Sequence, residues 1–150
     1  MDKTYHLALD LGATSGRSVL ASYDGSRVEM TELTRFHYPM LPMSGHLFWN
    51  LPLIYQEVLN SLREARIRLE AQDASLMSVG IDTWGCDVAY FYADGTPAGL
   101  PYCYRDPHTT GAVDDYASRM GREELYERTG IQFMDFNTLF QLDTLRRTGA

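Results

Sequence analysis

A long amphipathic segment in the middle of the chain constrains the fold more than any other feature. Apolar residues recur at spacings of three and four through residues 51–69, a pattern typical of a helix of about five turns. Asn50 is a favourable N-cap, and Pro52 would lie in the first turn, where proline is tolerated. The sequence therefore predicts one helix here, with an apolar face that must pack against other elements.

Strand-like segments surround this helix and predict a mixed sheet. Three precede the helix and one follows it, at residues 5–9, 17–23, 28–36 and 77–81. The turn signal Asp24-Gly25 joins the second and third segments, so the first three are expected to form an antiparallel meander. A crossover through the helix would place the fourth strand parallel to the first. We therefore expect an α/β fold whose sheet contains both antiparallel and parallel pairs.

The remainder of the chain is expected to be less regular. Residues 39–49 are interpreted as a loop, and residues 86–92 as a fifth strand before a turn at Asp94-Gly95. Helical patterns return at residues 113–120, 123–128 and 138–147. With 150 residues, of which 45% are hydrophobic, the chain is long enough to bury the core of one domain.

The loop between the first two strands has the chemistry of an anion site. Gly12 and Gly16 would allow positive φ and a close approach of a ligand, and Thr14 and Ser15 add hydroxyl donors. Arg17 adds a permanent charge suited to phosphate. The spacing fits neither a Walker A loop nor the dinucleotide fingerprint. The alternative is an ordinary hairpin turn, because glycine, serine and threonine are common turn residues.

Two carboxylates strengthen the functional interpretation of this loop. Asp10 ends the first strand and could be an oxygen ligand of Mg²⁺, directly or through water. Asp82 ends the strand that is expected to lie parallel to it. Ligands of open α/β sheets bind at the carboxyl ends of the strands. Two carboxylates at one end of the sheet therefore favour a ligand site over a simple turn.

Composition and charge exclude several classes of protein. The formal net charge is −7 and no basic stripe is present, which argues against a nucleic-acid binder. No apolar run reaches the roughly 18 residues of a membrane helix, and the N-terminus lacks the pattern of a signal peptide. Cys86 and Cys103 form no metal-ligand motif, and free thiols in a reducing compartment are the simpler interpretation. We expect a cytoplasmic protein that binds neither nucleic acid nor membranes.

Five ordered segments carry a resemblance to a known family. Residues 10–17 resemble the first phosphate loop of the FGGY carbohydrate kinases, members of the actin and hexokinase superfamily with a ribonuclease H-like fold. Residues 80–87 resemble the sugar-contacting segment of those members that phosphorylate L-rhamnulose. The other segments are residues 100–106, 126–133 and 136–142. The resemblance extends from Leu7 to Leu145.

The resemblance implies a division of roles between two segments. The residues that would contact the phosphates of ATP are Ala13, Thr14, Ser15, Gly16 and Arg17, with Asp10 near Mg²⁺. Gly85 would lie against the sugar, where a missing side chain lets the backbone approach hydroxyl groups. Trp84 would form an apolar wall, and Asp82 and Asp87 would accept hydrogen bonds from sugar hydroxyls. The alternatives are core packing for Trp84 and a solvated strand end for Asp87.

At some positions the sequence departs from the family pattern, or the role of a residue has two interpretations. Cys86 stands where a small aliphatic residue is expected, and Pro107-His108 replaces a small residue and an arginine. The preceding Arg105-Asp106 could be an internal ion pair that shapes the sugar pocket or could contact the sugar. His46 and Trp49 are more readily explained by packing than by chemistry.

The resemblance also limits what this chain can do. Family members are longer, with two such domains, and their general base is an Asp in a later segment. Residues 1–150 are therefore expected to be an incomplete N-terminal domain without a catalytic base or second domain, inactive alone. The alternatives are a non-catalytic module that binds nucleotide or sugar or self-associates, and a kinase for another ketose. Truncation is expected to leave strand 77–81 as an exposed edge, through which chains could associate.

Overall fold

The computed structural model describes residues 3–149, which divide into two compact units. The first unit contains the residues up to Pro39 together with Asn50–Trp84. The second contains Met40–Trp49 and the residues from Gly85 onward. Each unit is therefore built from two separate stretches of the chain.

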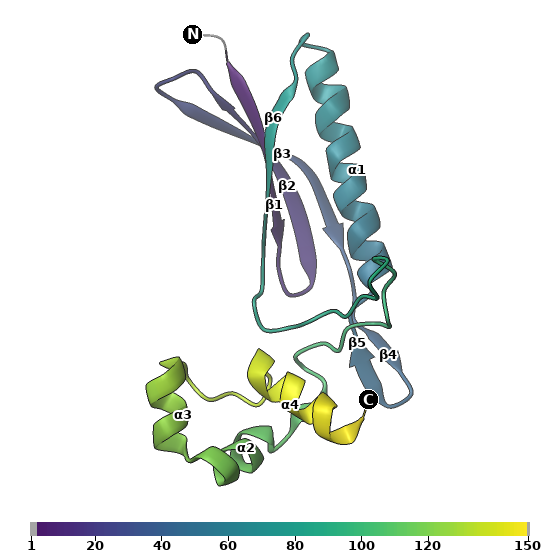
Figure 1. Cartoon of the computed structure of the whole chain (residues 1–150). Helices are drawn as coiled ribbons and strands as arrows, with labels where there is room; N and C mark the ends of the chain where they lie inside the picture. The colour runs from purple at the N-terminus through teal and green to yellow at the C-terminus, as the bar shows by residue number, and fades with distance from the viewer. Residues whose placement is uncertain (1–2, 150) are drawn as a thin grey trace. The chain divides into compact units, whose positions relative to one another are not determined.

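A four-stranded mixed sheet with one helix forms the first unit (Figure 1). The strand order is β3-β2-β1-β6, with antiparallel pairs β1/β2 and β2/β3 and a parallel pair β1/β6. The elements are β1 (Thr4–Leu11), β2 (Ser15–Tyr23), β3 (Val28–His37), α1 (Leu51–Glu70) and β6 (Leu76–Thr83). The predicted meander, crossover helix and parallel strand are all confirmed.

Helix α1 begins and packs as its sequence predicts. The Oδ1 atom of Asn50 accepts a hydrogen bond from the Leu53 amide at 3.2 Å, which caps the first turn. Ala65 of α1 is fully buried against Leu7 and Leu9 of β1, and these residues form the centre of the core of this unit. Since side chains alternate across a strand, Asp10 lies on the opposite face of the sheet from α1.

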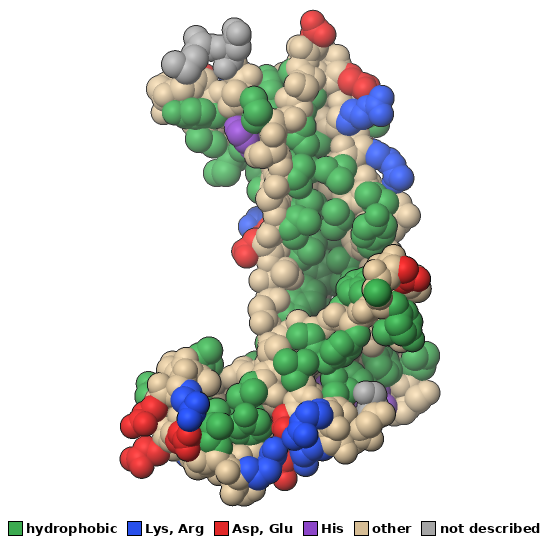
Figure 2. Space-filling model, viewed as in Figure 1, with side chains coloured by type: hydrophobic (Ala, Val, Ile, Leu, Met, Phe, Trp, Pro, Cys, Tyr) green, Lys and Arg blue, Asp and Glu red, His purple; other side chains and the backbone are tan. Residues whose placement is uncertain are grey.

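The free edge of β6 presents apolar side chains to solvent. Met77, Val79 and Ile81 are 66%, 45% and 56% exposed, and Figure 2 shows hydrophobic side chains gathered over β6 and α1. Their register partners on β1 place Val79 and Ile81 opposite Leu7 and Leu9, on the face that α1 covers elsewhere. The expected exposed edge at this strand is therefore present.

A small hairpin and short helices form the second unit. Its elements are β4 (Leu41–Met43), β5 (His46–Phe48), the 3₁₀ turn η1 (Pro107–Thr109), α2 (Ala112–Met120), α3 (Arg122–Thr129) and α4 (Thr138–Thr148). The core contains Val113, Leu125 and Phe140. The Asp135 carboxylate accepts hydrogen bonds from the amides of Gly111 and Val113, each at 2.9 Å, and so caps α2. The three predicted helices are confirmed.

Two predictions for this unit are wrong. Residues 39–49 contain the β4–β5 hairpin rather than only a loop. Residues 86–92 form no strand, and only an isolated bridge pairs Phe91 with Pro97. The Cys86 carbonyl instead accepts hydrogen bonds from the side chains of Thr138 and Gln141 on α4. The Tyr92 amide donates to the Thr96 carbonyl, and the Tyr90 carbonyl accepts from the Ala98 amide. Among residues 3–149, none of the helices combines the length and apolar character needed to cross a bilayer.

Candidate functional site

A row of charged side chains crosses the sheet at the end of β1. Asp10 is the register partner of Arg17 on β2 and of Asp82 on β6. Arg17 contacts Oδ2 of Asp10 through Nε and through an Nη atom, each at 2.9 Å. Both side chains are about half exposed, at 46% and 50%. The predicted meeting of Asp10 and Asp82 at one end of adjacent parallel strands is confirmed.

The two glycines of the loop between β1 and β2 act differently from the sequence prediction. Neither Gly12 nor Gly16 has positive φ, so the expected left-handed backbone is wrong. Close packing requires them instead. A Cβ atom on Gly16 would lie 2.5 Å from the ring of Phe36, and one on Gly12 would lie 3.2 Å from the Ser15 carbonyl oxygen. The loop is therefore wound tightly against its neighbours.

Hydrogen bonds from Tyr38 hold this loop in place. Its hydroxyl donates to the carbonyl oxygens of Gly12 and Ser15, the latter at 3.0 Å, and its amide donates to the Thr14 carbonyl at 3.2 Å. The side chain is fully buried. Burial, and then the nearby charge of Asp10, raise the pKa of Tyr38 to about 12. The phenol therefore remains a hydrogen-bond donor throughout the neutral range.

The other side of the loop is available to an anion. Within residues 3–149, the amides of Ala13 and Thr14 donate to no backbone carbonyl. Thr14 is exposed, and Ala13 and Ser15 are partly exposed. Successive amides that face outward from a turn form a concave anion site. Arg17 lies immediately beyond them, so the local chemistry fits phosphate.

The carboxylates beside the loop suit a hydrated cation. Across the described residues, no group of three His, Cys, Asp or Glu side chains could hold a metal ion alone. Mg²⁺ is commonly bound through one or two carboxylates, with water and phosphate completing its shell. Asp10 and the exposed Asp82 could supply those carboxylates. Arg17 already contacts Asp10, so a metal would share this carboxylate with a guanidinium group.

Trp84 follows β6 directly and is half-buried. Its ring centroid lies 6.3 Å from that of Tyr38, with the planes tilted by 34°. The contact supports a packing role for Trp84 within the first unit. Its predicted role as an apolar wall for a sugar stays a prediction.

In the second unit, Gly85 begins the segment expected to contact the sugar. A Cβ atom on Gly85 would meet no heavy atom within 4 Å, so the space beside its backbone is open. Burial, followed by the charge of Asp87, raises the pKa of the Cys86 thiol. This thiol is therefore a poor nucleophile at neutral pH.

Asp87 is held by several donors within the second unit. Its Oδ2 atom accepts hydrogen bonds from the indole of Trp49 and, at 3.2 Å, from the Tyr104 amide. Its Oδ1 atom accepts from Gln141 at 2.9 Å. A carboxylate has about four acceptor positions, so these contacts occupy most of its capacity. Asp87 is thus more firmly positioned than the alternative of a solvated strand end implied.

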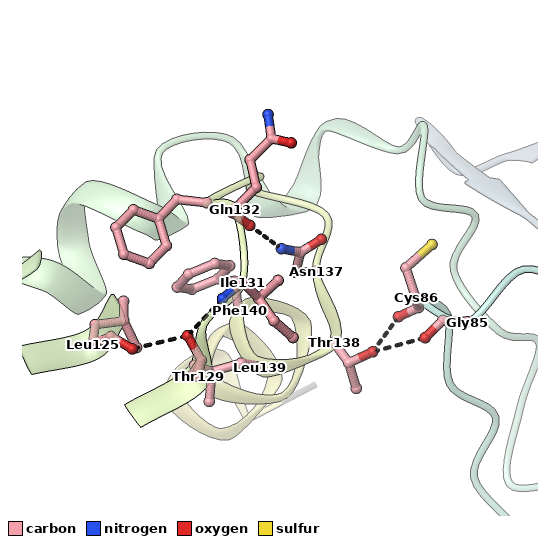
Figure 3. Close-up of a pocket in the computed structure, with 11 residues that line it drawn as sticks. Gly85, Cys86, Leu125, Thr129, Ile131, Gln132, Asn137, Thr138, Leu139 and Phe140 are labelled. Carbon is pink, nitrogen blue, oxygen red and sulfur yellow. Dashed lines mark hydrogen bonds between the residues drawn. The ribbon is translucent and has the colours of Figure 1, made fainter. Parts of the chain in front are cut away.

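A cavity of about 420 Å³ adjoins Gly85 and Cys86. Its walls are mainly apolar and come from α3, α4 and the segment between them: Leu125, Ile131, Phe133, Leu139 and Phe140. Figure 3 shows Thr138 reaching toward the carbonyl oxygens of Gly85 and Cys86, which accept its hydroxyl at 3.5 and 2.7 Å. The side-chain amide of Asn137 donates to the backbone carbonyl of Gln132 at 2.7 Å. These bonds fix the polar rim of an apolar cavity.

Asp106 anchors the hairpin of the second unit, and its partners differ from those expected. Its buried carboxylate accepts from the amides of Leu47 at 2.6 Å and His108 at 2.8 Å, and contacts the imidazoles of His46 and His108. Burial opposes ionisation, but these hydrogen bonds hold the pKa of Asp106 below its ordinary value. The possible ion pair with Arg105 is not formed. The Arg105 guanidinium lies over the Tyr104 ring instead, 5.2 Å from its centroid.

Three polar residues of these sites were missed by sequence reasoning. Tyr38, Thr138 and Gln141 act through hydrogen bonds to residues far away in the sequence. The only available signal was that Thr138 and Gln141 fall in a segment that resembles the family. For Tyr38, its place between a strand and Pro39 indicates no function by itself.

Comparison with known proteins gives a consistent result. The sequence model that describes the N-terminal domain of the FGGY family of carbohydrate kinases matches residues 5–148. A protein named rhamnulokinase from Bacteroides thetaiotaomicron is 44% identical over 145 residues, which are 97% of this chain and 29% of the relative. A rhamnulokinase from Mannheimia succiniciproducens is 39% identical over 140 residues, 92% of this chain and 28% of the relative.

Solved structures share the fold at low sequence identity. Gluconate kinase from Lactobacillus acidophilus gives a TM-score of 0.79 at 17% identity, covering 99% of this chain and 29% of that one. Xylulose kinase from the same organism gives 0.79 at 17% identity, covering 97% and 29%. The chain therefore spans less than a third of the length of the proteins that it matches.

Proposed function

Because the chain belongs to the FGGY family of carbohydrate kinases, we propose that it is the N-terminal part of a rhamnulokinase. The reaction is transfer of a phosphoryl group from ATP to the 1-hydroxyl of L-rhamnulose. The observation that carries the kinase assignment is the tightly held loop beside Asp10, whose outward amides suit phosphate. The names of the relatives at 44% and 39% identity support the choice of sugar.

The phosphate loop would bind and orient the nucleotide. In this proposal the backbone of Ala13 to Gly16 and the hydroxyls of Thr14 and Ser15 surround the phosphates of ATP, and Arg17 offsets their charge. Asp10 would hold Mg²⁺ through water or directly. A bound Mg²⁺ would neutralise charge on the phosphates during transfer. The contribution of these residues is positioning, which dominates phosphoryl transfer.

The segment from Asp82 to Asp87 would contact the sugar. The open space at Gly85 leaves room for a hydroxyl group against the backbone. Asp87 would add an acceptor whose direction is fixed by Trp49 and Gln141. Trp84 would supply the apolar surface and Asp82 a second acceptor.

Residues beyond this chain would supply the remaining machinery. In the proposed arrangement the chain is an incomplete N-terminal domain, and a later segment supplies the general base and a second domain. The chain covers 29% of its relative from B. thetaiotaomicron. We therefore expect it to show negligible turnover by itself, in a cytoplasmic setting.

An assay of ADP release by the full-length gene product tests the proposal. L-rhamnulose, D-xylulose, glycerol and gluconate would be compared at equal concentrations with ATP and Mg²⁺. The expected result is the highest kcat/KM for L-rhamnulose, and none with the 150-residue chain. A preference for another ketose or for glycerol would contradict the assignment of the sugar.

A second candidate function follows from the free edge of β6. Its exposed Met77, Val79 and Ile81 favour association with another strand, as in a non-catalytic, self-associating module. Reading the coding sequence after Ala150 separates the two. An in-frame continuation that contains the later catalytic Asp removes the module, whereas a natural stop codon supports it.

A further inference from the structure

Three carbonyl groups of the phosphate loop point toward one residue. The Tyr38 hydroxyl donates to Gly12 and Ser15, and the Tyr38 amide donates to Thr14. A phenol carries one proton, so it is shared between its two carbonyl acceptors. The Gly12 amide also donates to the Ser15 carbonyl at 2.9 Å, which closes the turn. The carbonyls of Gly12, Thr14 and Ser15 are thereby engaged.

The planarity of the peptide bond gives these contacts a consequence for the amides. In a trans peptide, the C=O and the following N–H point in opposite directions. When the Gly12 carbonyl points to Tyr38, the Ala13 amide must point away from it. The Ala13 amide donates to no backbone carbonyl within the described residues, so it stays available to a ligand. The Tyr38 hydroxyl therefore sets the direction of the Ala13 amide.

We propose that Tyr38 is a positioning residue of the phosphate site, which orients the Ala13 amide toward the phosphates of ATP by holding the Gly12 carbonyl behind it. The inference rests on the proposed kinase function. Tyr38 does not touch the nucleotide in this arrangement. It acts through the backbone of Gly12 to Ser15.

Packing alone does not require the hydroxyl group. The Tyr38 ring contacts Phe36 at 5.9 Å and Trp84 at 6.3 Å between centroids, and phenylalanine would keep both contacts. Burying a hydroxyl is costly unless it forms hydrogen bonds. Here the Tyr38 hydroxyl forms hydrogen bonds with two carbonyls of the same loop. The neighbouring Asp10 raises the pKa of the phenol further, which keeps the donor proton in place.

The variant Tyr38→Phe tests this role in the full-length gene product. It removes the hydroxyl but retains the ring and the amide bond to Thr14. We expect the KM for ATP to rise about tenfold, the magnitude of one lost hydrogen bond, while the KM for L-rhamnulose stays unchanged. The control is Tyr5→Phe, which removes a hydroxyl at the far end of β1 that donates to Gln72 at 3.4 Å. The control should alter neither KM.

A binding measurement on this chain supplies an independent readout. Inorganic tripolyphosphate, titrated into ¹⁵N-labelled chain, should shift the amide resonance of Ala13 in the wild type. In Tyr38→Phe the same shift should require about tenfold more ligand. If Tyr38→Phe does not fold, 4-fluorophenylalanine at this position preserves the shape of the phenol without its donor proton.

The outcomes separate the two proposals. Wild type that phosphorylates the sugar, with unchanged KM for ATP in Tyr38→Phe, would overturn the positioning role alone. An equal rise in KM for both substrates would show a general structural defect and would also overturn it. Wild type that neither releases ADP nor responds to tripolyphosphate would overturn the proposed function and, with it, this inference.

Discussion

Arg17 contacts Asp10 through two nitrogen atoms, and both lie 2.9 Å from the same carboxylate oxygen, Oδ2. Neither contact uses Oδ1. The guanidinium thus balances the charge of Asp10 and fixes the orientation of its carboxylate. The Oδ1 atom has no contact with Arg17. Because both side chains are about half exposed, the pair should matter more to ligand binding than to the free energy of unfolding.

This difference can be measured with Asp10→Asn. In the full-length gene product we expect activity to fall about 10- to 100-fold, as for loss of a group that orients a metal shell. The free energy of unfolding should change by less than about 1 kcal/mol. Glu32→Gln is the control, because it breaks an equally exposed ion pair with Arg35 on the same sheet. Similar activity in the two variants would contradict the role of Asp10.

Gly16 should be intolerant of a side chain for reasons of space. A methyl group at this position would meet the Phe36 ring at 2.5 Å and Leu11 at 3.0 Å. We expect Gly16→Ala to lower the free energy of unfolding by about 1–3 kcal/mol in urea titrations. Gly80→Ala is the control, since its methyl group would meet nothing within 4 Å. Adding Phe36→Leu should recover part of the loss, and no recovery would argue against the proposed clash.

The ion pairs of Asp143 predict that the chain loses stability in acid. Hydrogen bonds from Arg119, and then from Arg146 and Arg147, lower the pKa of Asp143 from 3.8 to about 2 in the folded chain. A lowered pKa stabilises the fold above pH 3.8, and this contribution disappears as the pH falls toward 2. Asp143→Asn should therefore reduce Tm at pH 6 but converge with wild type near pH 2. A Tm difference that is constant with pH would contradict this linkage.

The two cysteines should differ in their reaction with alkylating reagents. Burial raises the pKa of both thiols, and Cys103 is fully buried whereas Cys86 is partly exposed. With iodoacetamide at pH 8, we expect slow labelling of Cys86 and labelling of Cys103 only after addition of urea. Mass spectrometry of peptides gives both rates. Rapid labelling of Cys103 in the folded chain would be inconsistent with the structure.

The free edge of β6 can be tested in the 150-residue chain by sedimentation. If chains associate through it, Val79→Lys should shift the population toward monomer, because a charge on an edge strand opposes pairing. Met30→Lys is the matched control on β3, the other edge strand, where Met30 is 75% exposed. A wild-type chain that remains monomeric at high concentration would rule out this association.

Local patterns predicted much of the first unit. The alternating strands and the capped helix have strong periodic signals, and the crossover rule correctly placed Asp10 beside Asp82. Residues 86–92 have similar apolar and aromatic content but form no strand: α4 side chains bind the Cys86 carbonyl, and the backbone of Tyr90 and Tyr92 bonds across a local turn. The spacing of apolar residues indicates which side chains are buried. It does not indicate which groups form hydrogen bonds with the backbone.

Contacts distant in sequence explain what could not be predicted at the sites. The Tyr38 hydroxyl meets the Gly12 carbonyl 26 residues away, and His46 meets Asp106 60 residues away. Nothing in the neighbouring residues specifies such partners. The adjacent Arg105 was the obvious partner for Asp106, yet two histidines and two backbone amides surround this carboxylate.

The β4–β5 hairpin depends on a partner that is synthesised much later. Two strands of three residues are marginal on their own, and the Leu47 amide finds its acceptor on Asp106, 59 residues later. At about 5–20 residues per second, the ribosome needs roughly 3–12 s to supply that residue. The segments that form α1 and β6 are therefore synthesised before the hairpin has its acceptor on Asp106.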